Sequence, residues 1–232
     1  STRKESSAAS DVYKRQLDLI YMGEVTDESM PHLQKIDAIA EQAGKLTSQL
    51  LGYARKGKRQ VEQLPLKSLI DGAYNLFLPN TQTGIQTTLE VAEEPIMVEG
   101  DRTQLQQALL NLMINARDAM ETLPEDRRRL RIRAGFCEQL GVTPRPPADA
   151  SRGPFCCICV VDSGPGVDES IVEQIFEPFF TTKPTGKGTG MGLSMSYGVS
   201  REHGGWIQYD RVEPGASFTI VLPVLRQKEE PV

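Results

Sequence analysis

The sequence predicts an α/β protein that follows an N-terminal helical segment. Residues 101–120 show the period of an amphipathic helix, and the apolar run Phe155–Val161 is typical of a buried strand. Residues 33–54 add a heptad-like seam of apolar residues ahead of this part. With 232 residues, 39% of them hydrophobic, the chain can bury one core and carry a helical appendage.

Charge and hydropathy narrow the class of protein. The formal net charge is −5, which disfavours nucleic acid as the main partner. No stretch approaches the roughly 18 consecutive apolar residues of a membrane-spanning helix, and the mean hydropathy is −0.34. We therefore expect a cytoplasmic protein with no membrane contact in this chain. A full-length form anchored further upstream is compatible with the sequence.

The N-terminal residues predict an incomplete helical hairpin. Residues 1–16 are polar and are interpreted as a disordered leader or boundary remnant, and residues 17–60 as the hairpin. Because its first helix is short, a single amphipathic linker helix is the alternative interpretation. The second helix has apolar or small residues at steps of three and four, namely Leu33, Ile36, Ala40, Ala43, Thr47, Leu50 and Ala54.

The next residues predict one strand-rich stretch between two helices. Leu66–Phe77 has helical spacing, and Ile85–Val91 and Pro95–Val98 are expected to be strands. In the helix at residues 101–120, Asp101 suits the N-cap, and Gln104 is expected to reach back and complete a capping box. The apolar face of this helix holds Leu105, Leu109, Leu112, Ala116 and Ala119.

A polar stripe runs along another face of the same helix. An unpaired buried amide costs about 1–3 kcal/mol, so Asn115, close to small packed residues, predicts a ligand or a metal-bound water. A solvated stripe is the alternative, and it suits Gln104 and Gln107. The members of the stripe are Gln104, Gln107, Asn111, Asn115 and Asp118.

Two glycine clusters follow the buried strand. In the first, Asp162 stands before Gly164 and Gly166, where a carboxylate at a sharp turn can accept a hydrogen bond from a base. The second leads into a helix expected from Leu193, and the free N–H groups of a helix start favour phosphate. Neither common phosphate-loop pattern is present, and a flexible surface loop is the alternative for one cluster alone. The second cluster comprises Gly186, Gly188, Gly190 and Gly192 with Lys187, Thr189 and Met191 between them.

The remaining segments of the sequence predict structural elements to which we assign no functional role. The four cysteines, Cys137, Cys156, Cys157 and Cys159, lack metal-site spacing and are expected to be small buried thiols in a reducing compartment. Residues 141–153 predict a loop between strands, to which we assign no function. Trp206–Tyr209 and Ala216–Val224 are expected to close the sheet, with Pro214 and Gly215 in their turn.

Four ordered motifs carry a family resemblance. NLMINARDAM resembles the N box, DSGPGV the first glycine box, FEPFFTTK the F box and GTGMGLS the second glycine box of histidine-kinase ATPase domains in the GHKL superfamily. The resemblance implies a two-layer α/β sandwich over residues 61–228, with helices on a mixed sheet and ATP between the helices and a lid. It also implies a two-component sensor histidine kinase that uses ATP and Mg²⁺.

The resemblance assigns roles to individual residues. Asn115 resembles the Mg²⁺ ligand and Asp162 the adenine-reading carboxylate, with Gly164 and Gly166 shaping the adenine pocket. Phe176 and Phe179 are the F-box aromatics, which we expect to be core anchors that hinge the lid. Lid and phosphate contacts are expected from Lys183, Gly188, Thr189, Gly190, Met191, Gly192 and Leu193.

Position 111 discriminates within the superfamily. Gyrase-like and chaperone ATPases are expected to carry a glutamate base there, whereas the amide of Asn111 cannot act as a base. Transfer of the γ-phosphoryl group is therefore favoured over hydrolysis, with Asn111, Asn115 and Lys183 as the catalytic residues. A hydrolytic ATPase of the same fold and a non-enzymatic dimeric adaptor that binds a receiver domain are the alternatives.

The expected phosphoacceptor is missing from the sequence. The family's reactive histidine precedes the position of LDLIYMGE, but the only histidines are His32 and His203. We expect both to be structural, with His203 suited to a helix C-terminus. The resemblance thus implies transfer to a histidine absent from this chain and onward to a response-regulator receiver domain, within a homodimer formed by the hairpin.

Overall fold

The structure, a computed structural model, describes residues 60–80, 84–150, 153–184 and 188–225. The predicted leader and the seam at residues 33–54 lie outside these ranges. The chain divides into two compact units, one comprising residues 1–57 and 182–189 and the other residues 58–181 and 190–232. All the helices and strands given below belong to the second unit.

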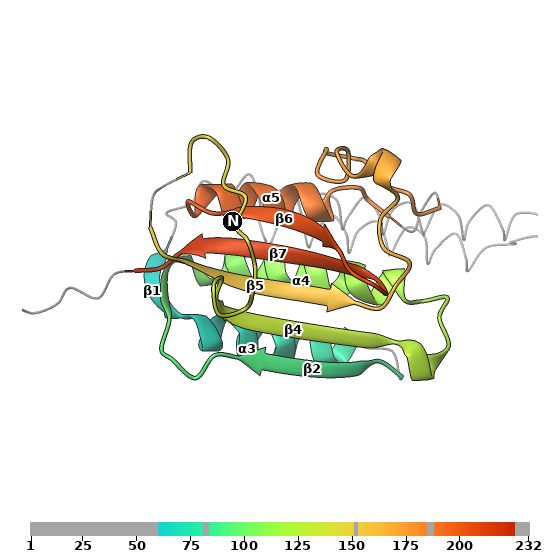
Figure 1. Ribbon diagram of the computed structural model, residues 1–232, viewed down its shortest axis with the longest axis horizontal. Helices are drawn as coiled ribbons and strands as arrows, with labels where there is room; N and C mark the ends of the chain where they lie inside the picture. Colours follow the sequence, from blue (N-terminus) through green and yellow to red (C-terminus); the bar gives the residue numbers. More distant parts are fainter. Residues whose placement is uncertain (1–59, 81–83, 151–152, 185–187, 226–232) are drawn as a thin grey trace, which may run out of the picture. The chain divides into compact units, whose positions relative to one another are not determined.

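A five-stranded mixed sheet forms one layer of this unit (Figure 1). Its strand order is β2-β4-β5-β7-β6, with β2 parallel to β4 and every other neighbouring pair antiparallel. The predicted closing hairpin is confirmed, because β6 and β7 pair on either side of Pro214 and Gly215. The strands are β2 (Gln86–Val91), β4 (Arg129–Phe136), β5 (Phe155–Asp162), β6 (Trp206–Arg211) and β7 (Ala216–Pro223).

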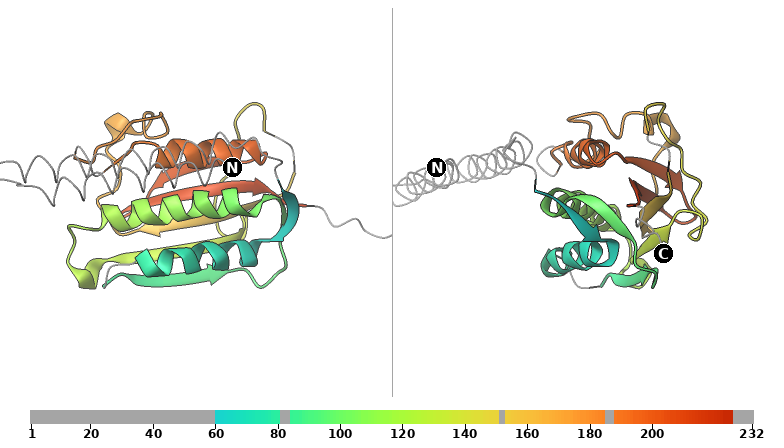
Figure 2. Two further views of the ribbon diagram at one scale, coloured as in Figure 1. Left: turned by 180° about the vertical axis from the view of Figure 1, so that it is seen from behind. Right: turned by 90° about the vertical axis from the view of Figure 1, so that its left-hand side faces the viewer.

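Three helices cover one face of the sheet (Figure 2). They are α3 (Leu66–Phe77), α4 (Arg102–Ala119) and α5 (Gly192–Glu202). The predicted two-layer α/β sandwich is confirmed, and α3 has the predicted bounds. A second, antiparallel sheet pairs β1 (Val61–Pro65) with β3 (Met97–Asp101). The sequence did not place β1, because Leu64 is its only buried residue and the strand shows no alternation.

Short 3₁₀ helices connect these elements. They are η1 (Leu78–Asn80), η2 (Glu125–Arg127) and η3 (Glu169–Ile171). Within the described ranges, no helix is both long enough and apolar enough to cross a membrane.

Strand β5 is buried on both faces, which explains its continuous apolar sequence. Cys156, Ile158 and Val160 belong to the large core between the sheet and the helices. Cys157 and Cys159 belong to a smaller cluster on the outer face. The three cysteines of this strand therefore lie alternately on its two faces, because successive side chains of a strand point to opposite faces.

The prediction of four free thiols is wrong for one pair. Cys137 and Cys157 form a disulfide across 20 positions of sequence, with their Cα atoms 5.1 Å apart. Antiparallel pairing of β4 with β5 brings them together, and linear spacing alone does not reveal this. Cys156 and Cys159 are free and buried as expected. Burial raises the pKa of Cys156 to about 12 and raises the pKa of Cys159 as well.

The loop after β4 covers the outer face of the sheet. Gln208 of β6 accepts a hydrogen bond from the Arg145 backbone N–H (3.1 Å) and donates one to the Thr143 carbonyl (3.2 Å). The Arg145 guanidinium pairs with Asp210 at 2.8 Å. Beneath the loop, Trp206 is 2% exposed. The described part of the predicted loop, residues 141–150, therefore completes the small outer core through Val142 and Ala150.

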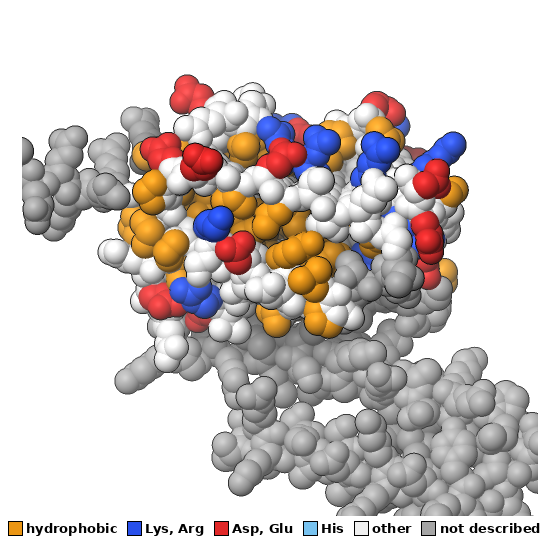
Figure 3. All heavy atoms as spheres, turned by 90° about the horizontal axis from the view of Figure 1, so that it is seen from below, with side chains coloured by type: hydrophobic (Ala, Val, Ile, Leu, Met, Phe, Trp, Pro, Cys, Tyr) orange, Lys and Arg blue, Asp and Glu red, His pale blue; other side chains and the backbone are white. Residues whose placement is uncertain are grey.

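Strand β2 forms one of the two edges of the sheet. Figure 3 views the protein from this side, and hydrophobic side chains gather near the middle of the face among charged ones. Exposed apolar side chains are Leu89 of β2, Leu76 of α3 and Leu78 of η1. Glu90 of β2 pairs with Arg131 and Arg133 of β4, and charged side chains on an edge strand discourage pairing with another chain.

The outer core yields a prediction for Cys137→Ser. Losing a cross-link that closes a loop of this length should lower the free energy of unfolding by about 2–4 kcal/mol. Trp206 is the single tryptophan, so release of the loop should also shift tryptophan emission to longer wavelength. A dithiol reductant should produce the same shift in the unmodified protein and none in the variant. Identical emission before and after reduction would show that the loop stays in place without the disulfide.

Candidate functional site

Asp162, the last residue of β5, is the most strongly perturbed carboxyl of the site. Its side chain is only 3% exposed, and Oδ1 accepts a hydrogen bond from the Gly164 backbone N–H at 2.7 Å. Burial raises the pKa of Asp162 to about 6, because a charged carboxylate is poorly solvated there; hydrogen bonds from the Gly164 and Ala216 amides oppose the rise. A buried acceptor at the mouth of a site suits a donor group of a ligand.

The glycines after Asp162 allow a close approach of three segments. A side chain at Gly164 would place its Cβ 2.8 Å from Asp162 Oδ1 and 3.2 Å from the Ala119 carbonyl oxygen. Gly166 has a φ of +77°, and its Cβ would lie 3.0 Å from the Gly215 carbonyl oxygen. The end of α4, the turn after β5 and the turn before β7 therefore meet around the Asp162 carboxyl. This confirms the sharp turn that the sequence predicts.

Asn115 belongs to α4, and its side chain lies beside the first residue of α5. A Cβ on Gly192 would be 3.7 Å from Asn115 Nδ2, so the amide borders the first turn of α5. Within the described ranges, the Asn115 side chain makes no hydrogen bond, and it is only half-buried. An amide oxygen that is accessible and not used by the fold can coordinate a hard cation or bind a polar group of a ligand.

Three other members of the polar stripe have side-chain partners in the fold. Gln107 is exposed, as predicted, and donates from Nε2 to Asn111 Oδ1 at 3.1 Å. Asp118 accepts hydrogen bonds from the neighbouring Arg117 guanidinium at 2.7 and 2.9 Å. Asn115 is the candidate ligand-binding amide because its side chain borders the first turn of α5.

The predicted capping box is half wrong. Asp101 does cap α4, because its Oδ1 accepts from the Gln104 backbone N–H at 3.1 Å. Gln104 does not reach back, since the Asp101 backbone N–H donates instead to Nε2 of His203 at 2.9 Å. The buried Oε1 of Gln104 has no partner among the described residues. A contact between residues 102 positions apart replaced the local one that the motif suggested.

The second glycine cluster leads into α5 as predicted, with the helix beginning at Gly192 rather than Leu193. Met191, just before it, is 4% exposed, and Leu193 packs against the main core. Gly190 has a φ of +67°, and a Cβ there would lie 2.3 Å from the Phe179 carbonyl carbon. The backbone before α5 therefore tolerates no side chain at position 190.

The two F-box aromatics differ in their surroundings. Phe176 packs against the main core and lies 5.6 Å from the Tyr197 ring centroid, as expected of an anchor. Phe179 is 70% exposed at a φ of 69°, so the prediction that it anchors the core is wrong. Phe180 is instead the second aromatic of this segment that packs against the core. The Phe179 backbone is closely packed against Gly190, and this turns the side chain outward.

Three predicted site residues belong to the other compact unit. Lys183, Gly188 and Thr189 fall within residues 182–189, so their approach to Asn115 and Asp162 stays a prediction. The structure adds Ala119, Gly215 and Ala216 to the surroundings of Asp162. Nothing in the local sequence marks Ala119 or Ala216, because their role comes from where the backbone passes.

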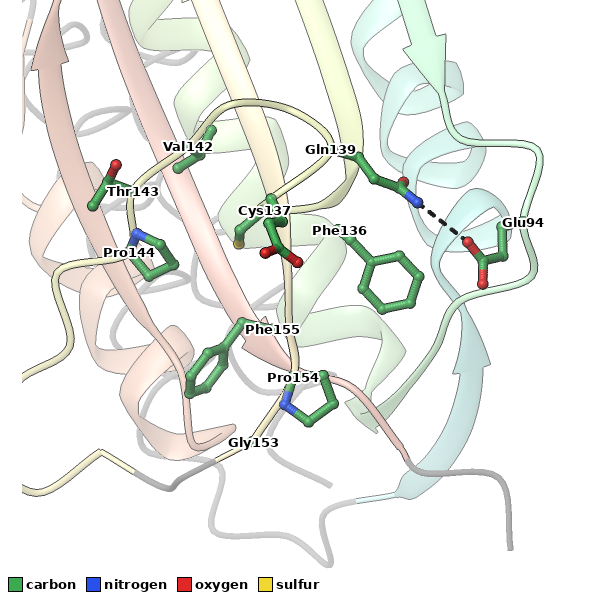
Figure 4. Close-up of a pocket in the computed structure, with 11 residues that line it drawn as sticks. Glu94, Phe136, Cys137, Gln139, Val142, Thr143, Pro144, Gly153, Pro154 and Phe155 are labelled. Carbon is green, nitrogen blue, oxygen red and sulfur yellow. Dashed lines mark hydrogen bonds between the residues drawn. The ribbon is translucent and has the colours of Figure 1, made fainter. Parts of the chain in front are cut away.

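A separate groove of about 640 Å³ lies beside the outer loop (Figure 4). Phe136 and Phe155 line it, and a 3.4 Å hydrogen bond joins Gln139 to Glu94 on one side. None of the predicted site residues lines this groove. The candidate site is therefore the region around Asp162, Asn115 and Gly192, on the helical side of the sheet.

Comparison with known proteins identifies the family of this part of the chain. Residues 100–226 match the family model described as histidine kinase-, DNA gyrase B-, and HSP90-like ATPase. The chain is similar to sensor kinase CckA of Brucella abortus, with 35% identity over 88% of this chain and 21% of that protein. The chain therefore spans about a fifth of the length of that relative.

Two solved structures extend the comparison. The nucleotide-free catalytic domain of histidine kinase ThkA has 31% identity and a TM-score of 0.56, over 71% of this chain and 97% of that one. ThkA in complex with the response regulator TrrA has a TM-score of 0.62 over 96% of this chain and 58% of that one. Its identity is 22%, so this second likeness concerns the fold alone.

The buried carboxyl predicts an unusual dependence of stability on pH. Because the folded pKa of Asp162 lies near 6, above its ordinary value of 3.8, the folded chain takes up this proton at a higher pH than the unfolded chain. The free energy of unfolding should therefore gain at most about 3 kcal/mol from this group as pH falls through 6 toward 4.

Comparing unmodified protein with Asp162→Asn isolates this contribution. Carboxyls whose pKa is lowered, such as Asp168, act in the opposite direction in both proteins and cancel in the difference. Thermal unfolding without nucleotide, followed at several pH values, is the measurement. A stability difference between the two proteins that does not change between about pH 7 and pH 5 would contradict the raised pKa.

Proposed function

Because the chain belongs to the histidine kinase-, DNA gyrase B-, and HSP90-like ATPase family, we propose that it is the ATP-binding catalytic part of a two-component sensor histidine kinase. The observation that carries this proposal is the buried Asp162 carboxyl at the glycine turn, on the same side of the sheet as Asn115 and the start of α5. The Asp162 carboxyl suits the amino group of adenine, and Asn115 with the start of α5 suits a metal-bound phosphate chain.

Each residue has a distinct task in the proposed site. The Asp162 carboxylate accepts a hydrogen bond from the adenine amino group, and Gly164 and Gly166 keep the pocket open beside it. The glycine-rich approach to α5 and the N–H groups of its first turn favour the phosphates. Lys183 is proposed to stabilise negative charge on the transferring group.

The residues present fit a Mg²⁺ ion. Asn115 offers an amide oxygen that no described residue uses, and Mg²⁺ accepts few protein ligands when phosphates and water complete its shell. Asn115 would hold the ion, which would supply positive charge against the negative charge of the phosphates. The contribution of the chain is to hold the ion at Asn115, beside the start of α5.

Phosphoryl transfer is favoured over hydrolysis. The Asn111 amide lies one turn before Asn115 and accepts a hydrogen bond from Gln107, and an amide cannot remove a proton from water. The acceptor is proposed to be a histidine other than His203. That side chain is 7% exposed, and both ring nitrogens are engaged by backbone groups.

The partners of this domain follow from the proposed role. We propose that the phosphoryl group passes onward to a response-regulator receiver domain, and that the protein dimerises through the N-terminal hairpin. The ThkA–TrrA complex, which shares the fold, is a histidine kinase bound to a response regulator. His32 and the hairpin lie outside the described residues, so their roles rest on the sequence motifs.

The first prediction concerns nucleotide affinity. The chain should bind Mg-ATP, and Asp162→Asn should weaken binding by about 1–3 kcal/mol, because a charged hydrogen bond to adenine is lost. In the unmodified chain, ATP should bind more tightly with Mg²⁺ than with the Mg²⁺ chelated, and Asn115→Ala should remove this difference in affinity. Isothermal titration measures both effects. Asp210→Asn on the outer face is the matched control, and equal affinity in all four proteins would refute the site.

The second prediction concerns turnover. The unmodified chain should bind ATP yet release phosphate no faster than buffer, because position 111 holds no base. Asn111→Glu should introduce measurable phosphate release, whereas Gln107→Glu, one turn away on the same face, should not. A coupled phosphate assay makes the comparison. Steady hydrolysis by the unmodified chain would favour the hydrolytic ATPase alternative.

A further inference from the structure

His203 is a buried joint between the two helices of the proposed site. It follows the last residue of α5 and is 7% exposed. Its Nε2 accepts from the Asp101 backbone N–H at 2.9 Å, and its Nδ1 lies 2.7 Å from the Val199 carbonyl oxygen. Because a carbonyl only accepts, Nδ1 must carry the proton. The neutral ring therefore links the end of α5 to the start of α4.

This joint is one of three places at which α5 lies against α4. Asp101 meets His203 at one end. In the middle, the Ser196 hydroxyl shares its single proton between the Ala108 carbonyl of α4 at 3.2 Å and the Gly192 carbonyl of α5 itself at 2.9 Å. At the other end, Asn115 borders Gly192. Residue numbers rise along α4 as they fall along α5, so the helices are antiparallel. Sliding α5 along its axis would disturb all three contacts together.

The surroundings of His203 leave it little room to move. A Cβ on Gly100 would lie 2.5 Å from the ring Cδ2 atom, so position 100 must lack a side chain. Beyond the ring, Gly204 has a φ of +73°, and a Cβ on Gly205 would lie 2.0 Å from the Val221 carbonyl oxygen. The backbone at Gly100 packs against the ring, and the backbone at Gly205 packs against β7. The imidazole therefore keeps a fixed distance between the end of α5 and the start of α4.

We propose that His203 is a positioning residue that sets the axial register of α5 on α4, and through it the placement of the phosphate-binding turn at Gly192 beside Asn115. The inference rests on the proposed function, because it concerns the phosphate end of that site. The adenine end is built from Ala119, Asp162 and Gly215, and α5 contributes none of these. Loss of the joint should therefore weaken phosphate binding and spare adenosine.

Two substitutions of His203 test whether the hydrogen-bond acceptor at the Nε2 position matters apart from the rest of the imidazole ring. In His203→Gln, the side-chain oxygen can reach the position of Nε2 and accept from Asp101. In His203→Asn, the shorter side chain cannot. Affinity for Mg-ATP, from isothermal titration, should fall about five- to tenfold in the Asn variant, the equivalent of one hydrogen bond, and stay near the unmodified value in the Gln variant.

Adenosine is the internal control for folding. Its affinity, from NMR titration at millimolar concentration, should be the same in all these proteins, which a general loss of structure would not allow. Ser196→Ala removes the middle contact and should lower Mg-ATP affinity in the same selective way. Equal loss of adenosine and Mg-ATP, equal effects of Gln and Asn, or no change in Asn and Ser196→Ala would each overturn the inference. Failure of the unmodified chain to bind Mg-ATP would instead refute the proposed function.

Discussion

Strand β5 is covered on both faces, and this burial determines the environment of the carboxyl at its end. Helices α3 to α5 cover one face, while the loop after β4 and the Cys137–Cys157 disulfide cover the other. Neither face of the strand is exposed to solvent, so the Asp162 carboxyl at its end lies in an environment of low dielectric constant. Its pKa rises because no described cation offsets the lost hydration.

A buried carboxylate of this kind lowers stability and gives a ligand site. The two amides of Gly164 and Ala216 satisfy part of its hydrogen-bonding capacity, and what remains is available to a donor from outside the fold. The same burial that disfavours the charged form strengthens a hydrogen bond to it, because water competes poorly there. Stability at neutral pH and recognition of a base are thus opposed at one residue.

Close backbone approach organises the rest of the site. A Cβ on Gly164 would lie 3.2 Å from the Ala119 carbonyl oxygen, and a Cβ on Gly190 or Gly215 would overlap the backbone of Phe179 or Asp162. The end of α4 and the turns after β5 and before β7 therefore meet without side chains between them, and the approach to α5 packs in the same way against Phe179. Between α4 and α5, the hydrogen bonds of His203 and Ser196 add polar contacts of fixed geometry to the apolar packing of Leu193 and Tyr197 against the core.

The sequence by itself determined the elements with strong periodicity and the motifs with local meaning. Helix α3, most of α4, the paired closing strands and the turn after Asp162 follow from spacing, and the four ordered boxes identify the family. Features that depend on contacts between distant segments were decided by the tertiary structure alone. Pairing of β4 with β5 made a disulfide of two cysteines 20 positions apart, close packing at Gly190 turned Phe179 outward, and His203 replaced Gln104 as the partner of the Asp101 amide. Local patterns specify which groups need partners, but only the folded chain selects which partner comes within hydrogen-bonding distance.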